Sequence, residues 1–127
     1  MIELPPALAD SDAATLASID RPIDLVHLAR MTLGERSLER EVLQLFDRQA
    51  MMLMERMQAA PVEAVPMLAH TLKGSARAIG AAQVARAAAA VEATDTADPA
   101  NLKRALGVLR AATEEARGFI ADLLRAH

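Results

Sequence analysis

Apolar residues recur at helical spacing in several separate segments of the chain. A helix turns about 100° per residue, so residues three, four and seven apart lie on one side. Between residues 62 and 79 one such stripe consists of Val65, Leu68, Leu72, Ala76 and Ile79. This pattern predicts an amphipathic helix that has Pro66 in its first turns and ends at Gly80.

Four other segments have the same periodicity. They are a short helix over residues 23–31, a long helix from Ser37 to the stop at Pro61, and helices over residues 82–93 and 100–125. Asp20 and Ser37 are the expected N-caps of the first two. The sequence therefore predicts an all-α fold, an antiparallel up-down four-helix bundle with a short additional N-terminal helix.

The stripes of these helices predict the core. In the long helix the expected stripe is Leu38, Val42, Leu45, Phe46, Gln49 and Leu53. Met51 and Met54 fall outside it and are expected to be exposed, where flexible methionines suit adaptable contact surfaces. The last two helices contribute Val84, Ala88, Val91, Leu102, Leu106, Leu109, Thr113, Ala116, Ile120 and Leu123.

The first 21 residues differ from the rest, because they are rich in proline and aspartate. We interpret residues 1–21 as an arm with a short helical turn at residues 13–19, and residues 22–127 as one bundle domain. Hydrophobic residues make up 53% of the chain but aromatic residues only 2%, so much of the core is alanine. Helices must pack closely to bury enough area with such small side chains.

Composition narrows the class of protein. The formal net charge of -3 gives no basic footprint for nucleic acid, and the lack of cysteine excludes disulfides. Neither a signal-peptide pattern nor an apolar run of about 20 residues is present. We expect a cytoplasmic protein with no membrane association, and a self-contained bundle favours a monomer.

The polar side of the helix at residues 62–79 carries the candidate chemistry. His70, Lys73, Gly74 and Arg77 are spaced so that they share the face opposite the apolar stripe. This places a histidine on a solvent face with two cations beside it. Glycine inside a helix costs about 0.5–1 kcal/mol relative to alanine, so Gly74 needs a local reason. Either a neighbouring helix approaches there, or the glycine clears space for a partner next to His70, and the helical phase favours the second.

These residues form a recognisable motif. The run from Ala69 to Ser75, followed by Ile79-Gly80-Ala81, resembles the signature of histidine-containing phosphotransfer (HPt) domains, which reads roughly H-x-L-K-G-S/A-x-x-x-x-G. Helical patterning extends the resemblance from about residue 23 to the C-terminus. One departure is Ala78, where many members of the family carry Asn. We expect this change to alter the end of the helix and not the chemistry.

The resemblance implies a phosphocarrier and not an enzyme. His70 would accept a phosphoryl group from an aspartyl-phosphate receiver domain of a response regulator or hybrid histidine kinase, and pass it to another receiver. Lys73 and Arg77 can supply positive charge near the phosphoryl oxygens. The receiver would bring Mg²⁺, so we expect no cofactor here. We also expect no metal site, because His27 and His127 have no ligand spacing.

The remaining site predictions concern contacts. Met67 lies one turn before His70, and together with Gly74, Met51 and Met54 it is predicted to dock the partner. Two polar residues are candidates for a supporting contact with the imidazole. They are Ser75, whose alternative role is helix packing, and Glu92, whose alternative is a solvated carboxylate.

Two other functions remain open from the sequence. The chain could be a non-catalytic helical adaptor that binds receiver domains, although such an adaptor would not need the imidazole. It could also be a histidine domain like those of chemotaxis kinases, phosphorylated by a separate ATP-binding partner. The chain has no glycine-rich nucleotide-binding loop of its own.

Overall fold

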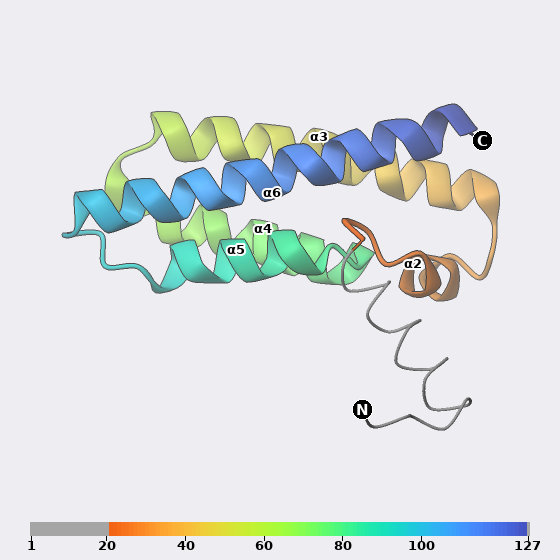
Figure 1. Cartoon of the computed structure of the whole chain (residues 1–127), viewed down its shortest axis with the longest axis horizontal. Helices are drawn as coiled ribbons and strands as arrows, with labels where there is room; N and C mark the ends of the chain where they lie inside the picture. The colour runs from red at the N-terminus through yellow and green to blue at the C-terminus, as the bar shows by residue number, and fades with distance from the viewer. Residues whose placement is uncertain (1–20, 127) are drawn as a thin grey trace, which may run out of the picture.

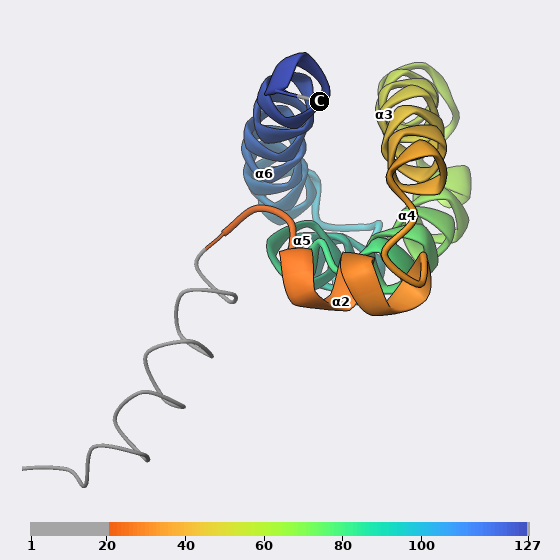
Figure 2. The same ribbon diagram turned by 90° about the vertical axis from the view of Figure 1, so that its right-hand side faces the viewer.

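The structure, a computed structural model, describes residues 21–126. Its helices are α2 (Leu25–Met31), α3 (Arg36–Ala59), α4 (Val65–Ile79), α5 (Ala82–Ala93) and α6 (Pro99–Ala126), with a 3-10 turn η1 (Val62–Ala64) before α4. No strand occurs within the described residues. The four long helices run alongside one another and short α2 lies across one end (Figures 1 and 2). This confirms the predicted all-α bundle with a short additional N-terminal helix.

The neighbouring long helices differ in how tightly they pack. Helices α4 and α5 form one side and have the most extensive contact, whereas α3 and α6 on the other side have the least. Alanines explain the close pair, because Ala69 and Ala76 of α4 and Ala85 and Ala88 of α5 are buried and their small side chains let the helices approach closely. Side chains on the outer face of α4 and α5 are therefore carried by the most extensively packed pair of helices in the bundle.

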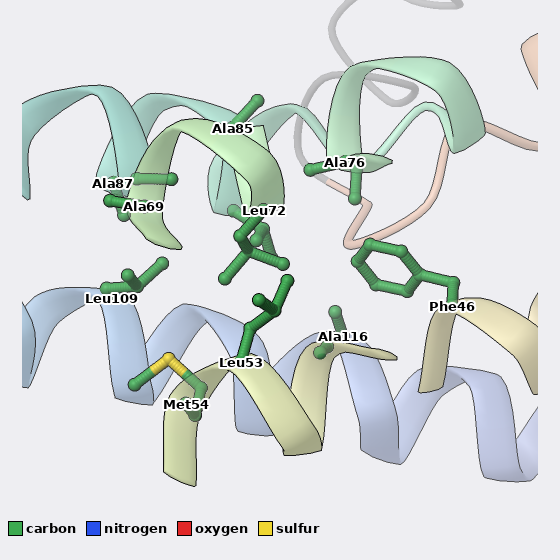
Figure 3. Packing of buried hydrophobic residues seen from close by; sticks show 14 of the residues in the cluster. Phe46, Leu53, Met54, Ala69, Leu72, Ala76, Ala85, Ala87, Leu109 and Ala116 are labelled. Carbon is green, nitrogen blue, oxygen red and sulfur yellow. The ribbon is translucent and has the colours of Figure 1, made fainter. Parts of the chain in front are cut away.

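The core consists almost entirely of aliphatic side chains, and Phe46 is the one aromatic residue that is buried within the described part of the chain. Figure 3 shows Leu53 of α3 and Leu72 of α4 pointing toward each other, with Phe46 near Ala76 and Leu109 near Ala69. Leu43, Leu72, Leu109 and Ile120 are fully or almost fully buried. The predicted stripes of α4, α5 and α6 are confirmed in their central positions, while Leu68, Leu106 and Leu123 are only half-buried.

The phase predicted for α3 was partly wrong. The buried residues of α3 are Leu43, Phe46, Ala50, Leu53, Met54 and Met57. Leu38 and Leu45 are instead 37% and 60% exposed. This helix has apolar residues on two sides, so its own periodicity does not determine which side faces α4 and α6. The bundle buries the side that contains Ala50, where the small side chain lets the helices come close.

Two predicted helix starts were also wrong. Helix α2 begins at Leu25, where the Asp24 carboxylate accepts hydrogen bonds from the backbone N–H groups of Val26 and His27. Helix α3 begins at Arg36 after Glu35, one residue before the predicted cap Ser37. Residues 1–20 of the predicted arm, which include its helical turn at residues 13–19 and the predicted cap Asp20, lie outside the described residues.

Candidate functional site

Helix α4 ends in a way that holds its position relative to α2 and α5. Gly80 closes the helix with a φ of +87°, a left-handed conformation that favours glycine. The backbone N–H of Asp24 donates to the carbonyl of Gly80 at 2.9 Å, and His27 Nε2 donates to the carbonyl of Ala78 at 2.8 Å. The last turn of α4, where Ala78 departs from the family pattern, is therefore hydrogen-bonded by the side chain of His27 from α2.

The exposed side of α4 presents the imidazole of His70. This side chain is 59% exposed, and its Nδ1 lies 2.7 Å from Oε2 of Glu92 on α5. A carboxylate only accepts hydrogen bonds, so Nδ1 carries the hydrogen. In the neutral ring the free lone pair then belongs to Nε2. The supporting contact predicted for Glu92 is present, and it fixes both the orientation and the tautomer of the ring.

The same carboxylate also engages Lys73. The Lys73 ammonium lies 2.5 Å from Glu92 Oε1, and the lysine side chain is only 16% exposed. The hydrogen bonds from Lys73 and His70 hold the pKa of the Glu92 carboxyl below its ordinary value of 4.5. Glu92 is therefore ionised at neutral pH and connects the cation to the ring.

The surface around the ring is open and partly apolar. Pro66, Met67, His70 and Glu92 line a shallow depression of about 330 Å³, and Met67 is 69% exposed. Apart from its chain neighbours and the backbone of its own helix, a Cβ built on Gly74 would meet no atom within 4 Å. No neighbouring helix therefore explains this glycine, which leaves an uncovered stretch of α4 one turn from His70. Met67 and Gly74 lie on the open face that the helical spacing predicts.

The other predicted site residues lie elsewhere. Arg77 is exposed and lines a notch with Arg86 near the α4–α5 turn, beyond the depression at His70. Ser75 faces α3, in a groove that it shares with Leu45, Phe46 and Ala78. The structure thus places Ser75 at a helix interface and not beside the imidazole.

The predictions made for Met51 and Met54 of α3 need correction. Met54 is only 7% exposed and belongs to the core, as Figure 3 shows, so the prediction that it is exposed for docking was wrong. Met51 is 41% exposed, but it lines the cleft between α3 and α6, where its sulfur accepts a hydrogen bond from Arg117. Both residues therefore lie away from the α4–α5 side that carries His70.

Sequence reasoning missed a different apolar surface on α3. Leu38, Leu45 and Met52, spaced seven residues apart, are 37%, 60% and 41% exposed. Leu45 shares a groove with Ser75 and Ala78 of α4, so this stripe lies next to α4. The regular spacing is visible in the sequence, but the predicted stripe of α3 assigns Leu38 and Leu45 to the core.

Two negative findings concern the described residues only. They contain no group of three or more His, Cys, Asp or Glu side chains that could hold a metal ion. Among the helices in residues 21–126, none is both long enough and apolar enough to cross a membrane.

The part of the chain that forms this site matches a known protein family. The family model described as the Hpt domain matches residues 41–119, which is more than half of the chain. Searches of curated proteins and of solved structures found no match. The matched span contains all of α4 and α5, with His70, Lys73 and Glu92. Fold and matched span agree, and the chain belongs to the family of Hpt domains, phosphocarriers that act by histidine phosphotransfer in phosphorelays.

Proposed function

We propose that this chain is a histidine phosphocarrier that receives a phosphoryl group on His70 from a receiver domain and passes it to another receiver. The observation that carries the proposal is the hydrogen bond between His70 Nδ1 and Glu92 on an otherwise exposed ring. An exposed imidazole with one nitrogen held as a donor leaves the other as the nucleophile. Hpt domains in general interact with receiver domains in phosphorelays.

The transfer step follows from this tautomer. The Nε2 lone pair of His70 attacks the phosphorus of the aspartyl phosphate, a phosphorus–nitrogen bond forms, and the bond from phosphorus to the aspartate oxygen breaks. The receiver's aspartate leaves as a carboxylate. The proton on Nδ1 stays in its hydrogen bond with Glu92, whose negative charge stabilises the more positive phosphorylated ring. The second transfer reverses these bond changes on another receiver.

Lys73 and Mg²⁺ have separate roles in the proposal. Lys73 lies one turn from His70 and can move from Glu92 toward the phosphoryl oxygens, where it would offset their charge. Magnesium is expected on the receiver, with no metal or other cofactor on this chain. The support that the sequence suggested for Arg77 at the phosphoryl group stays a prediction, since its side chain lines a separate notch.

The docking surface is proposed to be apolar next to the ring. Met67 and the uncovered Gly74 would form its centre, and the stripe of Leu45 and Met52 on α3 would extend it. This replaces Met51 and Met54, which face the α3–α6 side and the core. Apolar centres with charged rims are the usual arrangement because burying an unpaired charge is expensive.

The decisive experiment is phosphotransfer profiling against purified, phosphorylated receiver domains. The wild-type chain should acquire acid-labile phosphate from at least one receiver, and His70→Gln should acquire none while keeping the helical circular dichroism spectrum. Phosphate on the His70→Gln variant would overturn the assignment of His70. Labelling only by a kinase with ATP would favour the chemotaxis-like alternative, and receiver binding without any labelling would favour the adaptor.

A further inference from the structure

A basic notch lies at the corner where α2, α4 and α5 meet. It has a volume of about 310 Å³ and is lined by Asp24, His27, Arg77, Gly80, Ala82, Ala85 and Arg86. Its lining includes the small residues Gly80, Ala82 and Ala85, and the side chains of Arg77 and Arg86 are exposed. The long side chains at this corner are therefore those of Arg77 on α4 and Arg86 on α5, together with side chains from the α2 region.

The polar and charged side chains of this notch differ in whether they already have a hydrogen-bond or ion-pair partner. The Asp24 carboxylate accepts the N–H groups at the start of α2, and His27 Nε2 donates to the carbonyl of Ala78. Among the described residues, neither Arg77 nor Arg86 forms an ion pair or a hydrogen bond through its side chain. Two guanidinium groups are thus free to bind an anionic group, with Asp24 as the one acidic side chain lining the notch beside them.

The helices that form the notch have a net charge of opposite sign to that of the whole chain. Helices α4 and α5 together carry three cations against one carboxylate, a net charge of +2, whereas the whole chain has a net charge of -3. Glu92, the one carboxylate on these two helices, is already bound to Lys73 and His70. A negatively charged protein has therefore gathered uncompensated positive charge on the pair of helices that presents His70.

The notch lies close enough to His70 for one partner to contact both. Arg77 is seven residues after His70 on α4, so the two share a face and lie about 10 Å apart along the helix axis. A specific interface buries about 800 Å² on each partner, equivalent to a disc of roughly 16 Å radius. A partner that centres its interface on His70 consequently covers the notch or its edge.

We propose that Arg77 and Arg86 form a charge-recognition site for carboxylates on the surface of the partner receiver domain, and that this site selects among receivers. The proposal rests on the proposed function and adds to it the chemistry that distinguishes one partner from another. Guanidinium groups suit this role because they bind carboxylates in a fixed, often bidentate geometry. Charges at an interface edge mainly accelerate association and disfavour partners with like charge.

The test compares charge reversals that change the net charge equally. Arg77→Glu and Arg86→Glu are measured against Arg125→Glu, which replaces an exposed arginine in the last turn of α6. The C-terminal end of α6 lies away from the α4–α5 pair (Figure 2). The probe is the receiver that transfers phosphate fastest to the wild-type chain in the profiling experiment. Association rates are measured by stopped flow at low and high salt, and circular dichroism checks that each variant is folded.

We expect Arg77→Glu and Arg86→Glu each to slow association by about tenfold at low salt, with most of the loss removed at about 0.5 M salt. Arg125→Glu should change the rate less than about twofold. If receivers label the wild-type chain but all three variants associate alike, the notch proposal is overturned while the proposed function stands. If no receiver labels the wild-type chain, both fall together.

Discussion

At the scale of single residues, Glu92 determines how His70 can react. Its two carboxylate oxygens hold different groups, Oε2 the imidazole Nδ1 and Oε1 the Lys73 ammonium. Hydrogen bonds to an ionised acceptor are roughly twice as strong as those between neutral groups. One side chain from α5 therefore aligns both the nucleophile and the cation that α4 provides.

The first prediction tests this alignment. Glu92→Gln keeps the shape of the side chain but removes its charge, so the ring is held less firmly and Lys73 loses its ionic partner. The rate of phosphotransfer from a receiver should fall by about tenfold, because weakening one hydrogen bond to a charged group by about 1.4 kcal/mol in the transition state corresponds to that factor. Glu63→Gln in η1, an exposed carboxylate outside the site, is the control and should transfer at the wild-type rate. Equal rates for both variants would contradict the role of Glu92.

A second prediction concerns pH. Because the folded protein lowers the pKa of Glu92, its carboxylate favours the folded state above the ordinary pKa of 4.5. This contribution is lost as the pH falls through the lower folded-state value, where the carboxylate is protonated. Urea unfolding at a series of pH values should therefore show a stability difference between wild type and Glu92→Gln at neutral pH that shrinks below pH 4.5. A difference that stays constant down to about pH 2 would be incompatible with this linkage.

Replacing Gly74 or Gly80 with alanine should change the stability of the protein in opposite directions. Gly74 lies in the second half of α4, and Gly80 ends that helix. Gly74 is helical and a methyl group added there would meet open space, so Gly74→Ala should raise the free energy of unfolding by about 0.5–1 kcal/mol. Gly80 has a φ of +87°, and an added Cβ would lie 3.1 Å from His27 Cδ2 and 3.3 Å from the Asp24 carbonyl oxygen. Gly80→Ala should therefore lower stability by about 1–2 kcal/mol. Urea denaturation measures both, and destabilisation by Gly74→Ala would show that the space there is not open.

At the scale of elements, α3 has two apolar faces with different uses. One face, which includes Leu43 and Leu53, fills the core. The other carries exposed Leu38, Leu45 and Met52 beside α4. An exposed apolar stripe next to the reactive helix is suited to binding a partner, because covering it removes apolar area from water.

The docking prediction belongs to this pair of elements. Met67→Glu places a carboxylate at the proposed centre of the interface and should weaken receiver binding by more than about 1 kcal/mol, because the charge is buried without a partner. Val108→Glu makes a matched apolar-to-acidic change at a site that is 58% exposed on α6 and should leave binding unaltered. Calorimetric titration with the receiver measures both. Equal affinities for Met67→Glu and wild type would place the docking surface elsewhere.

At the scale of the whole molecule, the seam between α3 and α6 has the least extensive contact of the four between neighbouring long helices. A cleft of about 300 Å³ lies there, and Arg117, which lines the cleft, forms an ion pair with Asp47 of α3 at 2.8 Å. Thr113 lines this cleft, is 2% exposed, and its hydroxyl has no hydrogen-bond partner among the described residues. By contrast, the hydroxyls of Thr71 and Thr94 donate to the carbonyl four residues earlier. The seam therefore keeps a polar group in a place suited to an apolar one.

Replacing that group gives the last prediction. Thr113→Val retains the branched shape and removes the buried hydroxyl, so it should stabilise the protein by about 1–3 kcal/mol, the cost of an unsatisfied buried polar group. Thermal and urea unfolding measure the change. Thr71→Val, at an exposed hydroxyl on α4 that is already hydrogen-bonded, is the comparison and should be neutral or slightly destabilising. A loss of stability in Thr113→Val would mean that water satisfies the hydroxyl.

The sequence by itself determined the features that depend on local spacing. Helical periodicity predicted the bundle and placed His70, Lys73 and Gly74 on one face of α4, and glycine at position 80 predicted the end of that helix. These predictions succeed because residues three, four and seven apart share a side of any helix, whatever it packs against. The family resemblance, carried by the same residues, is confirmed by the match to residues 41–119.

Only the tertiary structure decided which helix faces meet. The contact between Glu92 and His70 joins residues 22 positions apart on two helices, and the notch of Arg77 and Arg86 forms where those helices turn. The burial of Met54 and the exposure of Leu45 depend on how α3 is rotated against its neighbours. A helix with apolar residues on two sides satisfies its own periodicity in either rotation, so the choice is made by close packing across the whole bundle.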